Sequence, residues 1–220
     1  AQNIMKDNPY PSLHLARVMH ETSKPDQERE MVRRAISLDR RNVDAWAYYY
    51  NFLRELGDEQ KAVATIEEEC SGPGDANNAA PYIAIQGFYA SNEETREKAV
   101  EYAKKAVAKN SDDPLALLVL SALYGQMNRL DDIIRLLQPH EPKMMRDVRL
   151  ANNYFEALFQ ARQIDKVTKL LNALAASPDR QVKQFAIERS KGVAQFLQQQ
   201  QQELISNVNR PAPSGPARSN

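Results

Sequence analysis

Residues 43–63 read VDAWAYYYNFLRELGDEQKAV, in which two apolar segments flank a polar turn. The turn, Leu56-Gly57-Asp58, contains residues that commonly end one helix and begin the next. Each flanking helix would be about 13 residues long, which is too short to persist alone in water, so its apolar stripe must be covered by neighbours. The stretch therefore predicts a hairpin of two helices that is part of a larger helical stack.

The pattern returns along the chain at a fixed spacing. Trp46, Gly57-Asp58 and Ala62 resemble the tetratricopeptide repeat (TPR) consensus, which has an aromatic residue, a Gly-Asp turn and a small residue at these places. The 34-residue period that the resemblance implies gives five repeats, with the three extra residues 77–79 between the second and the third. The expected repeats are 9–42, 43–76, 80–113, 114–147 and 148–181.

Small residues in the third repeat indicate close helix packing. The resemblance implies that Gly87 and Ala99 face each other across the hairpin, where a bulky residue would push the two helices apart. Ala106 would admit the first helix of the next repeat. In the first repeat, the same alignment places Leu15, Ala16 and Met19 on the first helix, and it puts Leu13 at a position that looks into the concave face of the stack.

The expected fold is an all-α, right-handed α-solenoid of about five TPR-like helix pairs. Residues 182–208 are expected to form a C-terminal capping helix, because apolar residues recur there at helical spacing. Residues 1–8 are expected to be a flexible N-terminus. Residues 209–220 are expected to be a disordered Pro/Ser-rich tail, because this composition cannot build a core.

Composition narrows the kinds of partner. Lys+Arg and Asp+Glu both number 29, so there is no excess of positive charge to neutralise a phosphate backbone, and nucleic acid is not expected as a partner. The longest apolar run, residues 115–120, is far shorter than the roughly 20 residues that span a bilayer, so no direct membrane insertion is expected. The single cysteine, Cys70, excludes an intramolecular disulfide framework and a cysteine-rich zinc site.

Candidate catalytic groups are sparse. His14 and His20 are six residues apart, whereas two metal ligands on one helix usually stand four apart, and His140 lies between two prolines. The sequence contains no nucleotide-binding glycine loop, nucleophile elbow or zinc-protease motif. The runs of glutamate at residues 67–69 and 93–94 are typical of solvated faces. We therefore expect no catalytic residue, no cofactor and no metal, and we predict that the protein is not an enzyme.

The TPR resemblance implies a concave face lined by the first helix of each repeat. A face that is apolar at its centre and polar at its rim suits an amphipathic helix or an extended peptide. The alternative is that the C-terminal helix of the chain itself covers Leu115, Leu118 and Phe88. The residues expected to form the partner-binding groove are Arg17, His20, Asn51, Arg54, Ala84, Phe88, Leu118, Ala122, Asn152, Glu156 and Phe159.

One kind of partner is disfavoured. A TPR subclass grips a C-terminal carboxylate with a lysine and an asparagine four residues later, and Asn51 stands at the asparagine position. However, Ala47 replaces the lysine, and Ala84 stands where the next repeat would need a charge. Recognition of a chaperone-tail carboxylate is therefore not expected.

The predicted function is a protein-protein interaction scaffold or adaptor that binds a peptide or helix of a partner in the groove. Two alternatives stay open: an assembly factor of a bacterial envelope or secretion complex, for which the start at Ala1-Gln2 is the motive, and the TPR segment of a larger multidomain protein. A monomer is favoured. A cytoplasmic location is slightly favoured, and a periplasmic one stays open.

Overall fold

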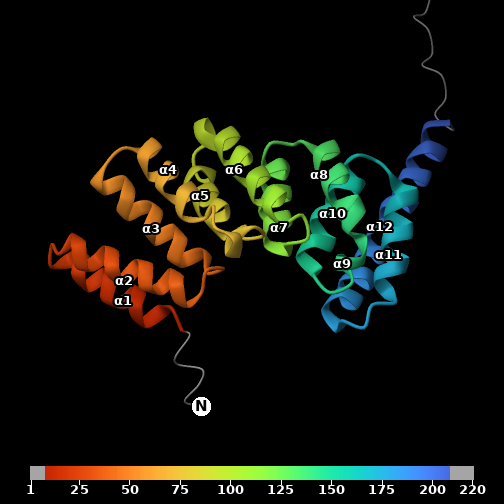
Figure 1. Cartoon of the computed structure of the whole chain (residues 1–220). Helices are drawn as coiled ribbons and strands as arrows, with labels where there is room; N and C mark the ends of the chain where they lie inside the picture. Colours follow the sequence, from red (N-terminus) through yellow and green to blue (C-terminus); the bar gives the residue numbers. More distant parts are fainter. Residues whose placement is uncertain (1–7, 209–220) are drawn as a thin grey trace, which may run out of the picture.

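The computed structural model describes residues 8–208, and within them it consists of helices and turns without a strand. The long helices follow one another as antiparallel pairs stacked in a line (Figure 1). The all-α helical-repeat solenoid expected from the sequence is thus confirmed. The expected flexible N-terminus 1–8, apart from Asn8, and the expected tail 209–220 lie outside the described residues.

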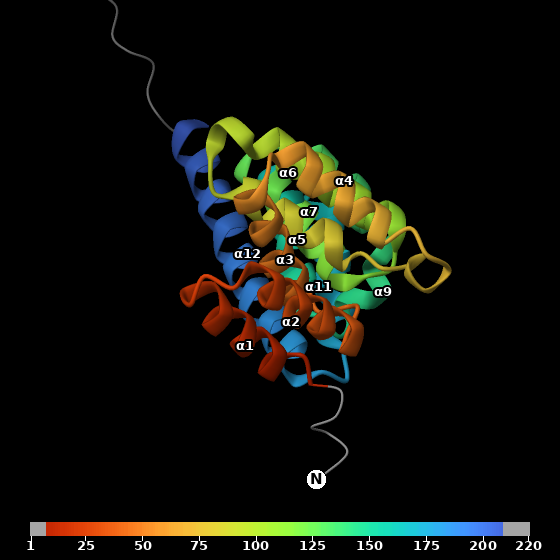
Figure 2. The ribbon, with the colours of Figure 1, turned by 60° about the vertical axis from the view of Figure 1, so that its left-hand side comes forward.

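Five pairs, one short helix and one further long helix make up the stack in residues 8–208. The first pairs are α1 (Tyr10–Glu21) with α2 (Pro25–Leu38), α3 (Val43–Leu56) with α4 (Glu59–Glu69), and α5 (Ala80–Ala90) with α6 (Arg96–Lys109). They are followed by α7 (Pro114–Gln126) with α8 (Leu130–Leu137), the short α9 (Glu141–Met144), α10 (Val148–Gln160) with α11 (Ile164–Ala175), and α12 (Arg180–Val208). Figure 2 shows the pairs one behind another, with α12 along one side.

The turns between the paired helices of the fourth and fifth pairs have the same geometry. Asn128 and Arg162, which are 34 residues apart, both adopt a positive φ, of 54° and 59°. The following residues close equivalent hydrogen bonds: Arg129 N donates to Tyr124 O at 2.8 Å, and Gln163 N donates to Leu158 O at 2.9 Å. This left-handed C-terminal turn satisfies carbonyls that the end of a helix leaves free. The fourth and fifth pairs are therefore built alike in their backbone.

The starts of the first helices repeat as well. Asp113 and Asp147, again 34 residues apart, each accept hydrogen bonds at Oδ1 from the first-turn amides of α7 and α10. Asn42 caps α3 in the same manner through the amide of Ala45 at 2.9 Å. Such caps satisfy amides that have no partner inside the helix. This cap sets where the second, fourth and fifth pairs begin.

Small residues let the helices approach in the centre of the stack. Ala99, Ala103 and Ala106 on α6 are completely buried. Trp46 on α3 is also completely buried, and its indole Nε1 donates to the carbonyl oxygen of Arg40 at 2.8 Å. The aromatic residue and the small residues that carried the TPR resemblance are thus core residues.

The expected rotation of two first helices was wrong. Gly87 is exposed, and a Cβ atom placed on it would meet no atom within 4 Å, so it does not face Ala99. Ala84, expected in the groove, is 5% exposed and belongs to the core. On α1, Leu15 is 48% exposed, whereas Leu13 is buried. Nearly every residue of the first half of α5 is apolar, so the sequence pattern could not fix which side faces inward.

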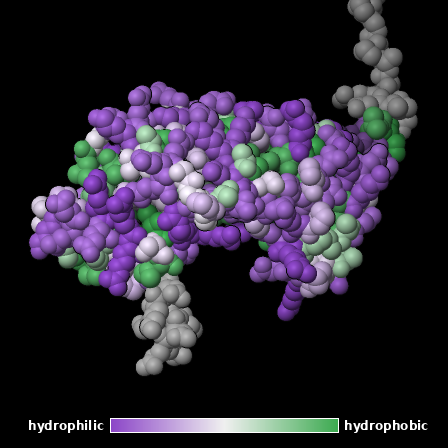
Figure 3. Space-filling model, in the orientation of Figure 1, coloured by the Kyte–Doolittle hydropathy of each residue, from purple (hydrophilic) through white to green (hydrophobic). Residues whose placement is uncertain are grey.

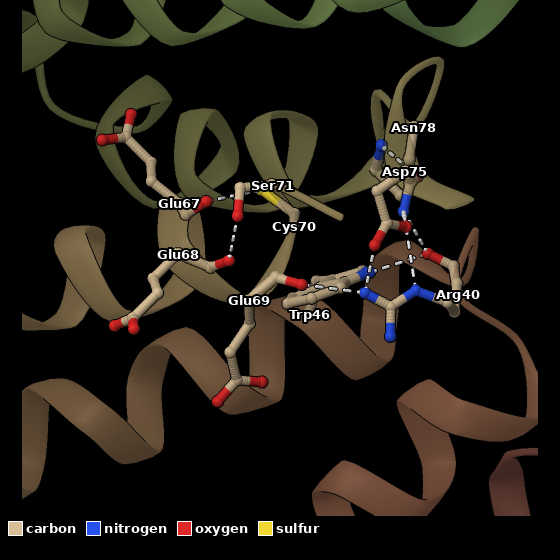
Figure 4. Close-up of polar contacts among 10 residues, drawn as sticks. Arg40, Trp46, Glu67, Glu68, Glu69, Cys70, Ser71, Asp75 and Asn78 are labelled. Atoms are coloured by element: carbon tan, nitrogen blue, oxygen red, sulfur yellow. Dashed lines mark hydrogen bonds and ion pairs between the residues drawn. The ribbon is translucent and has the colours of Figure 1, made fainter. Parts of the chain in front are cut away.

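An ion pair ties the loop with the three extra residues to the turn between α2 and α3 (Figure 4). Arg40 Nε donates to Asp75 Oδ1 at 2.8 Å, and Nη2 of the same guanidinium pairs with Asp75 Oδ2. Asp75 is 3% exposed and also accepts a hydrogen bond from Asn78 Nδ2 at 3.0 Å. The hydrogen bond from Arg40 holds the pKa of Asp75 below its ordinary value. The loop is therefore fixed across the junction of the first three pairs.

Candidate functional site: a groove between α1 and α3

Three clefts follow one another between α1 and α3. The first, of about 400 Å³, is lined by residues from Tyr10 and Asp44 to Arg17 and Asn51. The second, of about 250 Å³, shares Arg17, Tyr48 and Asn51 with the first. The third, of about 210 Å³, shares His20, Glu28, Phe52 and Glu55 with the second. Because neighbouring clefts share lining residues, they form one groove, which we call the α1–α3 groove.

Short side chains keep the groove open. One hydrogen bond joins the two helices directly at their N-terminal ends, from the hydroxyl of Tyr10 to Asp44 Oδ2 at 3.2 Å. Further along α3, Ala47 and Asn51 line the groove, and neither is long enough to reach across it. α1 instead packs on α2, which in turn packs on α3. The groove thus forms because α2 packs on both helices, whereas α1 and α3 make little direct contact with each other.

A buried carboxylate lies in the wall of the groove. Glu28 on α2 is 4% exposed, and its Oε1 accepts a hydrogen bond from the hydroxyl of Tyr48 at 3.0 Å. Its Oε2 lies 3.3 Å from His20 Nδ1, which is also 3.8 Å from Glu55 Oε2. Burial, with the hydrogen bond to Glu28, raises the pKa of Tyr48, so that its hydroxyl stays protonated and donates. Both carboxylate oxygens of Glu28 therefore have partners on α1 or α3.

The middle cleft is more acidic than basic. It brings the carboxylates of Glu21, Glu28 and Glu55 together with one guanidinium, that of Arg17. Phe52, which is 3% exposed, supplies an apolar part of its lining. A cationic group with an apolar stem matches this combination, because a lysine or arginine side chain places methylenes on apolar surface and its charge near carboxylates.

The expected groove residues fall into four groups. Arg17, His20 and Asn51 line the α1–α3 groove. Arg54 and Phe88 contact each other, with the guanidinium carbon 3.7 Å from the ring centroid, and so join α3 to α5. The remaining groups are two buried or partly buried residues, Ala84 and Leu118, and four residues on α7 and α10, Ala122, Asn152, Glu156 and Phe159.

Most of the expected groove residues on α10 contact α12 instead of lining an open groove. Arg189 of α12 donates to Asn152 Oδ1 at 3.0 Å and lies 3.1 Å from Glu156 Oε1. The ring of Phe159 contacts that of Phe196 with centroids 5.1 Å apart. Asn152, Glu156 and Phe159 therefore hold the C-terminal helix of the chain itself. Ala122 and Glu156 also line a separate cleft of about 280 Å³ between α7 and α10.

The alternative that the C-terminal helix covers the middle of the stack does not hold for the two most exposed residues concerned. Leu115 is 39% exposed and Phe88 is 38% exposed. α12 packs on α10 and α11 instead. In the view of Figure 3, the surface of the stack is mainly hydrophilic, with separate hydrophobic patches.

Glu28, Tyr48 and Phe52 were not predicted as groove residues, because the TPR resemblance points only to selected positions of the first helices. A signal for Glu28 was present: it stands in register with Val32 and Ala35, at i+4 and i+7, on the buried stripe of α2. A charged residue on such a stripe requires a partner, which here is supplied by Tyr48 and His20.

The part of the chain that the structure describes shows neither a metal-binding cluster nor a membrane-spanning helix. Residues 8–208 contain no group of three or more His, Cys, Asp and Glu side chains placed to hold a metal ion. None of the described helices is long and apolar enough to cross a bilayer.

The chain was compared with known proteins. No protein-family model and no curated protein matches it. Among solved structures, PilF of Pseudomonas aeruginosa is similar with a TM-score of 0.43 and 16% identity, covering 84% of each chain. A thermophilic TPR protein of Thermus thermophilus is similar with a TM-score of 0.41 and 13% identity, covering 84% of this chain and 98% of that one. The stacked antiparallel pairs, recurring turns and recurring caps of this chain are those of a TPR-like helical repeat.

Proposed function

We propose that the chain is a protein-interaction scaffold that holds a peptide segment of a partner protein in the α1–α3 groove, with a lysine or arginine of that segment in the middle cleft. The observation that carries this proposal is the continuity of the three clefts, which share lining residues from one to the next. A continuous groove along a helix suits a linear segment better than a compact small molecule.

The dimensions of the groove limit the length of the segment. α1 has 12 residues, so the groove is roughly 18 Å long at 1.5 Å per helical residue. An extended peptide advances about 3.3 Å per residue, so five or six of its residues would fill the groove. The apolar part of the segment would lie over Leu13 and Ala47, which line the first cleft.

The acidic middle cleft supports a basic anchor. Glu55 is exposed, with 61% of its side chain accessible, and can turn toward a cation without losing a buried partner. Glu28 is held in place by Tyr48 and would act from the wall. Opposite charges across an interface favour the right register of binding as well as a faster encounter.

The test is selection of peptides from a random-peptide display library on the full chain. Selected peptides should be enriched in lysine or arginine, and their binding, measured by fluorescence anisotropy, should weaken about tenfold or more in Glu55→Lys. The matched control is Glu68→Lys, the same charge reversal at an exposed position of α4, which should bind as the wild type does.

A blocking variant tests the place of binding separately. Asn51 lines two of the three clefts, so Asn51→Trp should abolish binding of the selected peptides. Asn172→Trp, at an exposed position of α11, should leave binding unchanged. Equal binding by Asn51→Trp and the wild type would place the peptides elsewhere and overturn the proposal, and so would selected peptides without basic residues.

A further inference from the structure

α12 is the one long helix among residues 8–208 that is not followed by a second helix of its own pair. It spans 29 residues, and one of its faces packs on α10 and α11. On that face Val182 and Ala186 are completely buried and Val193 is 7% exposed. The opposite side, where a second helix of a pair would lie, has no helix against it in the described part of the chain.

The outer face of α12 carries a regular stripe. Its residues follow each other at alternating intervals of three and four, which is the spacing of a helix that packs along another helix. Three members are large and apolar: Ile187 is 41% exposed, Leu197 is 36% exposed and Leu204 is 66% exposed. The stripe consists of Ile187, Ser190, Ala194, Leu197, Gln201 and Leu204, all of them exposed.

The C-terminal turns of α12 extend beyond the pairs. Phe196 makes the last aromatic contact with the stack, and every residue from Leu197 to Ile205 is exposed. In Figure 1 this end projects past α11, and in Figure 3 a hydrophobic patch marks it. A few helical turns without packing are marginally stable in water. Packing of the apolar residues of this end on another helix would stabilise them.

We propose that α12 pairs with the α12 of a second copy, in antiparallel orientation, to form a symmetric dimer. This register places Ala194 opposite the partner's Leu204, and Leu197 opposite the partner's Gln201. The small residue thus receives the large one, as close packing of facing helices requires. The same contacts are made twice, as an isologous interface demands.

Charge and direction both favour a second copy as the occupant. The sequence from Gly192 to Gln202 contains no charged residue, so two such segments meet without like-charge repulsion. Up to Phe196 one side of α12 is covered by its own stack, so an antiparallel arrangement keeps the two stacks at opposite ends of the new pair. The dimer places a helix on the side of α12 where the second helix of its own pair would lie. The proposed dimer differs from the monomer favoured from sequence.

The first test is the mass of the full chain in solution as a function of concentration, by sedimentation equilibrium. The mass should rise from 25.0 kDa toward twice that value. Leu197→Glu/Leu204→Glu should stay at the monomer mass throughout. The matched control, Gln195→Glu/Gln202→Glu, adds the same two charges at the same spacing beside the stripe and should dimerise as the wild type does.

A second variant is expected to strengthen the dimer, so its effect cannot be explained by loss of folding as that of Leu197→Glu/Leu204→Glu could be. Gln201→Leu replaces the polar residue of the stripe by an apolar one and should lower the dissociation constant about tenfold or more, because a polar residue at such a position weakens helix pairing. Far-UV circular dichroism would verify that each variant keeps its helix content.

Orientation is tested by disulfide formation in a Cys70→Ala background. A mixture of Ala194→Cys and Leu204→Cys copies should form the mixed disulfide and little of either homodisulfide. Predominant Ala194→Cys homodisulfide would overturn the antiparallel arrangement. A mass that stays at the monomer value at every concentration, or a dimer that survives Leu197→Glu/Leu204→Glu, would overturn the proposal and leave a helix of another protein as the occupant of the stripe.

Discussion

The interface between α3 and α5 is closed by side chains, whereas the one between α1 and α3 is open. At the closed interface, the buried hydroxyls of Tyr50 and Tyr89 are hydrogen-bonded at 2.8 Å, and the ring of Phe88 meets that of Tyr50 edge-on with centroids 5.6 Å apart. At the open one, Ala47 and Asn51 face α1 across the groove. The same helix thus joins one neighbour and stands apart from the other.

The difference shows how a regular stack produces an irregular surface. The aspartate or asparagine cap recurs at α3, α7 and α10, and the left-handed turn recurs in the fourth and fifth pairs, so these first helices have much the same backbone setting. What varies is the size of the side chains that face each other between neighbouring first helices. Large aromatic residues close the interface and stabilise the stack, and small or polar residues leave room for a partner.

The largest effect is expected when a buried aromatic side chain is removed from the closed interface between α3 and α5. Tyr50 is 1% exposed, and Tyr50→Ala should lower the free energy of unfolding by about 3–5 kcal/mol, as truncation of a buried aromatic residue does. Asn51→Ala, one residue away at an exposed groove position, should change it by less than about 0.5 kcal/mol. Urea denaturation followed by the fluorescence of the single tryptophan measures both. Similar losses for the two variants would contradict the distinction between the interfaces.

A smaller effect is expected at the ion pair that fixes the loop before α5. Arg40→Met leaves the buried carboxylate of Asp75 without its guanidinium, and should lower the free energy of unfolding at neutral pH by about 1–3 kcal/mol.

The pH dependence of that loss identifies its cause. The folded-state pKa of Asp75 is depressed below 3.8, so the stabilisation is complete above that pH and is lost as the pH falls through the folded-state value. Denaturation series at several pH values should therefore show the difference between wild type and Arg40→Met shrinking as the pH falls through the acid range in which Asp75 becomes protonated. A loss that is the same at all pH values would mean that packing of Arg40, and not its charge, is responsible.

The smallest effects on the free energy of unfolding are expected when one tyrosine hydroxyl is removed from each interface. Tyr50→Phe removes the buried hydrogen bond to Tyr89 and should cost about 1 kcal/mol. Tyr10→Phe removes the exposed hydrogen bond to Asp44, and its cost should be below about 0.5 kcal/mol. Thermal unfolding of the two variants beside the wild type would show the order. A reversed order would mean that Tyr10 contributes more to holding α1 against α3 than its exposure indicates.

Sequence reasoning reached the fold because a few residues report it locally. Trp46, the Gly57-Asp58 turn and Ala62 mark one helix pair, and their spacing could be followed along the chain to the others. It failed where a helix has no polar side: the largely apolar α5 left its rotation undetermined, so Ala84 was assigned to the groove and Gly87 to the core.

The groove was harder to foresee than the stack. Whether α1 and α3 touch depends on how α2 holds them apart, which is a property of three helices together and not of any one pattern. Arg17, His20 and Asn51 were found because they lie on first helices, whereas Glu28 was missed because it comes from a second helix. The stripe on α12 is visible in the sequence, but only the structure shows that the other face of the helix is occupied.

The recurrence of Asp113 and Asp147 as caps has a consequence for how such a chain can change in length. Both residues end one pair and begin the next with the same hydrogen bonds, so the segment from one to the other is a self-contained unit. If that unit were removed or duplicated, the helix after the new junction would still be preceded by an aspartate that caps it. The span between the groove at one end and α12 at the other can therefore evolve in steps of one helix pair, without either end being rebuilt.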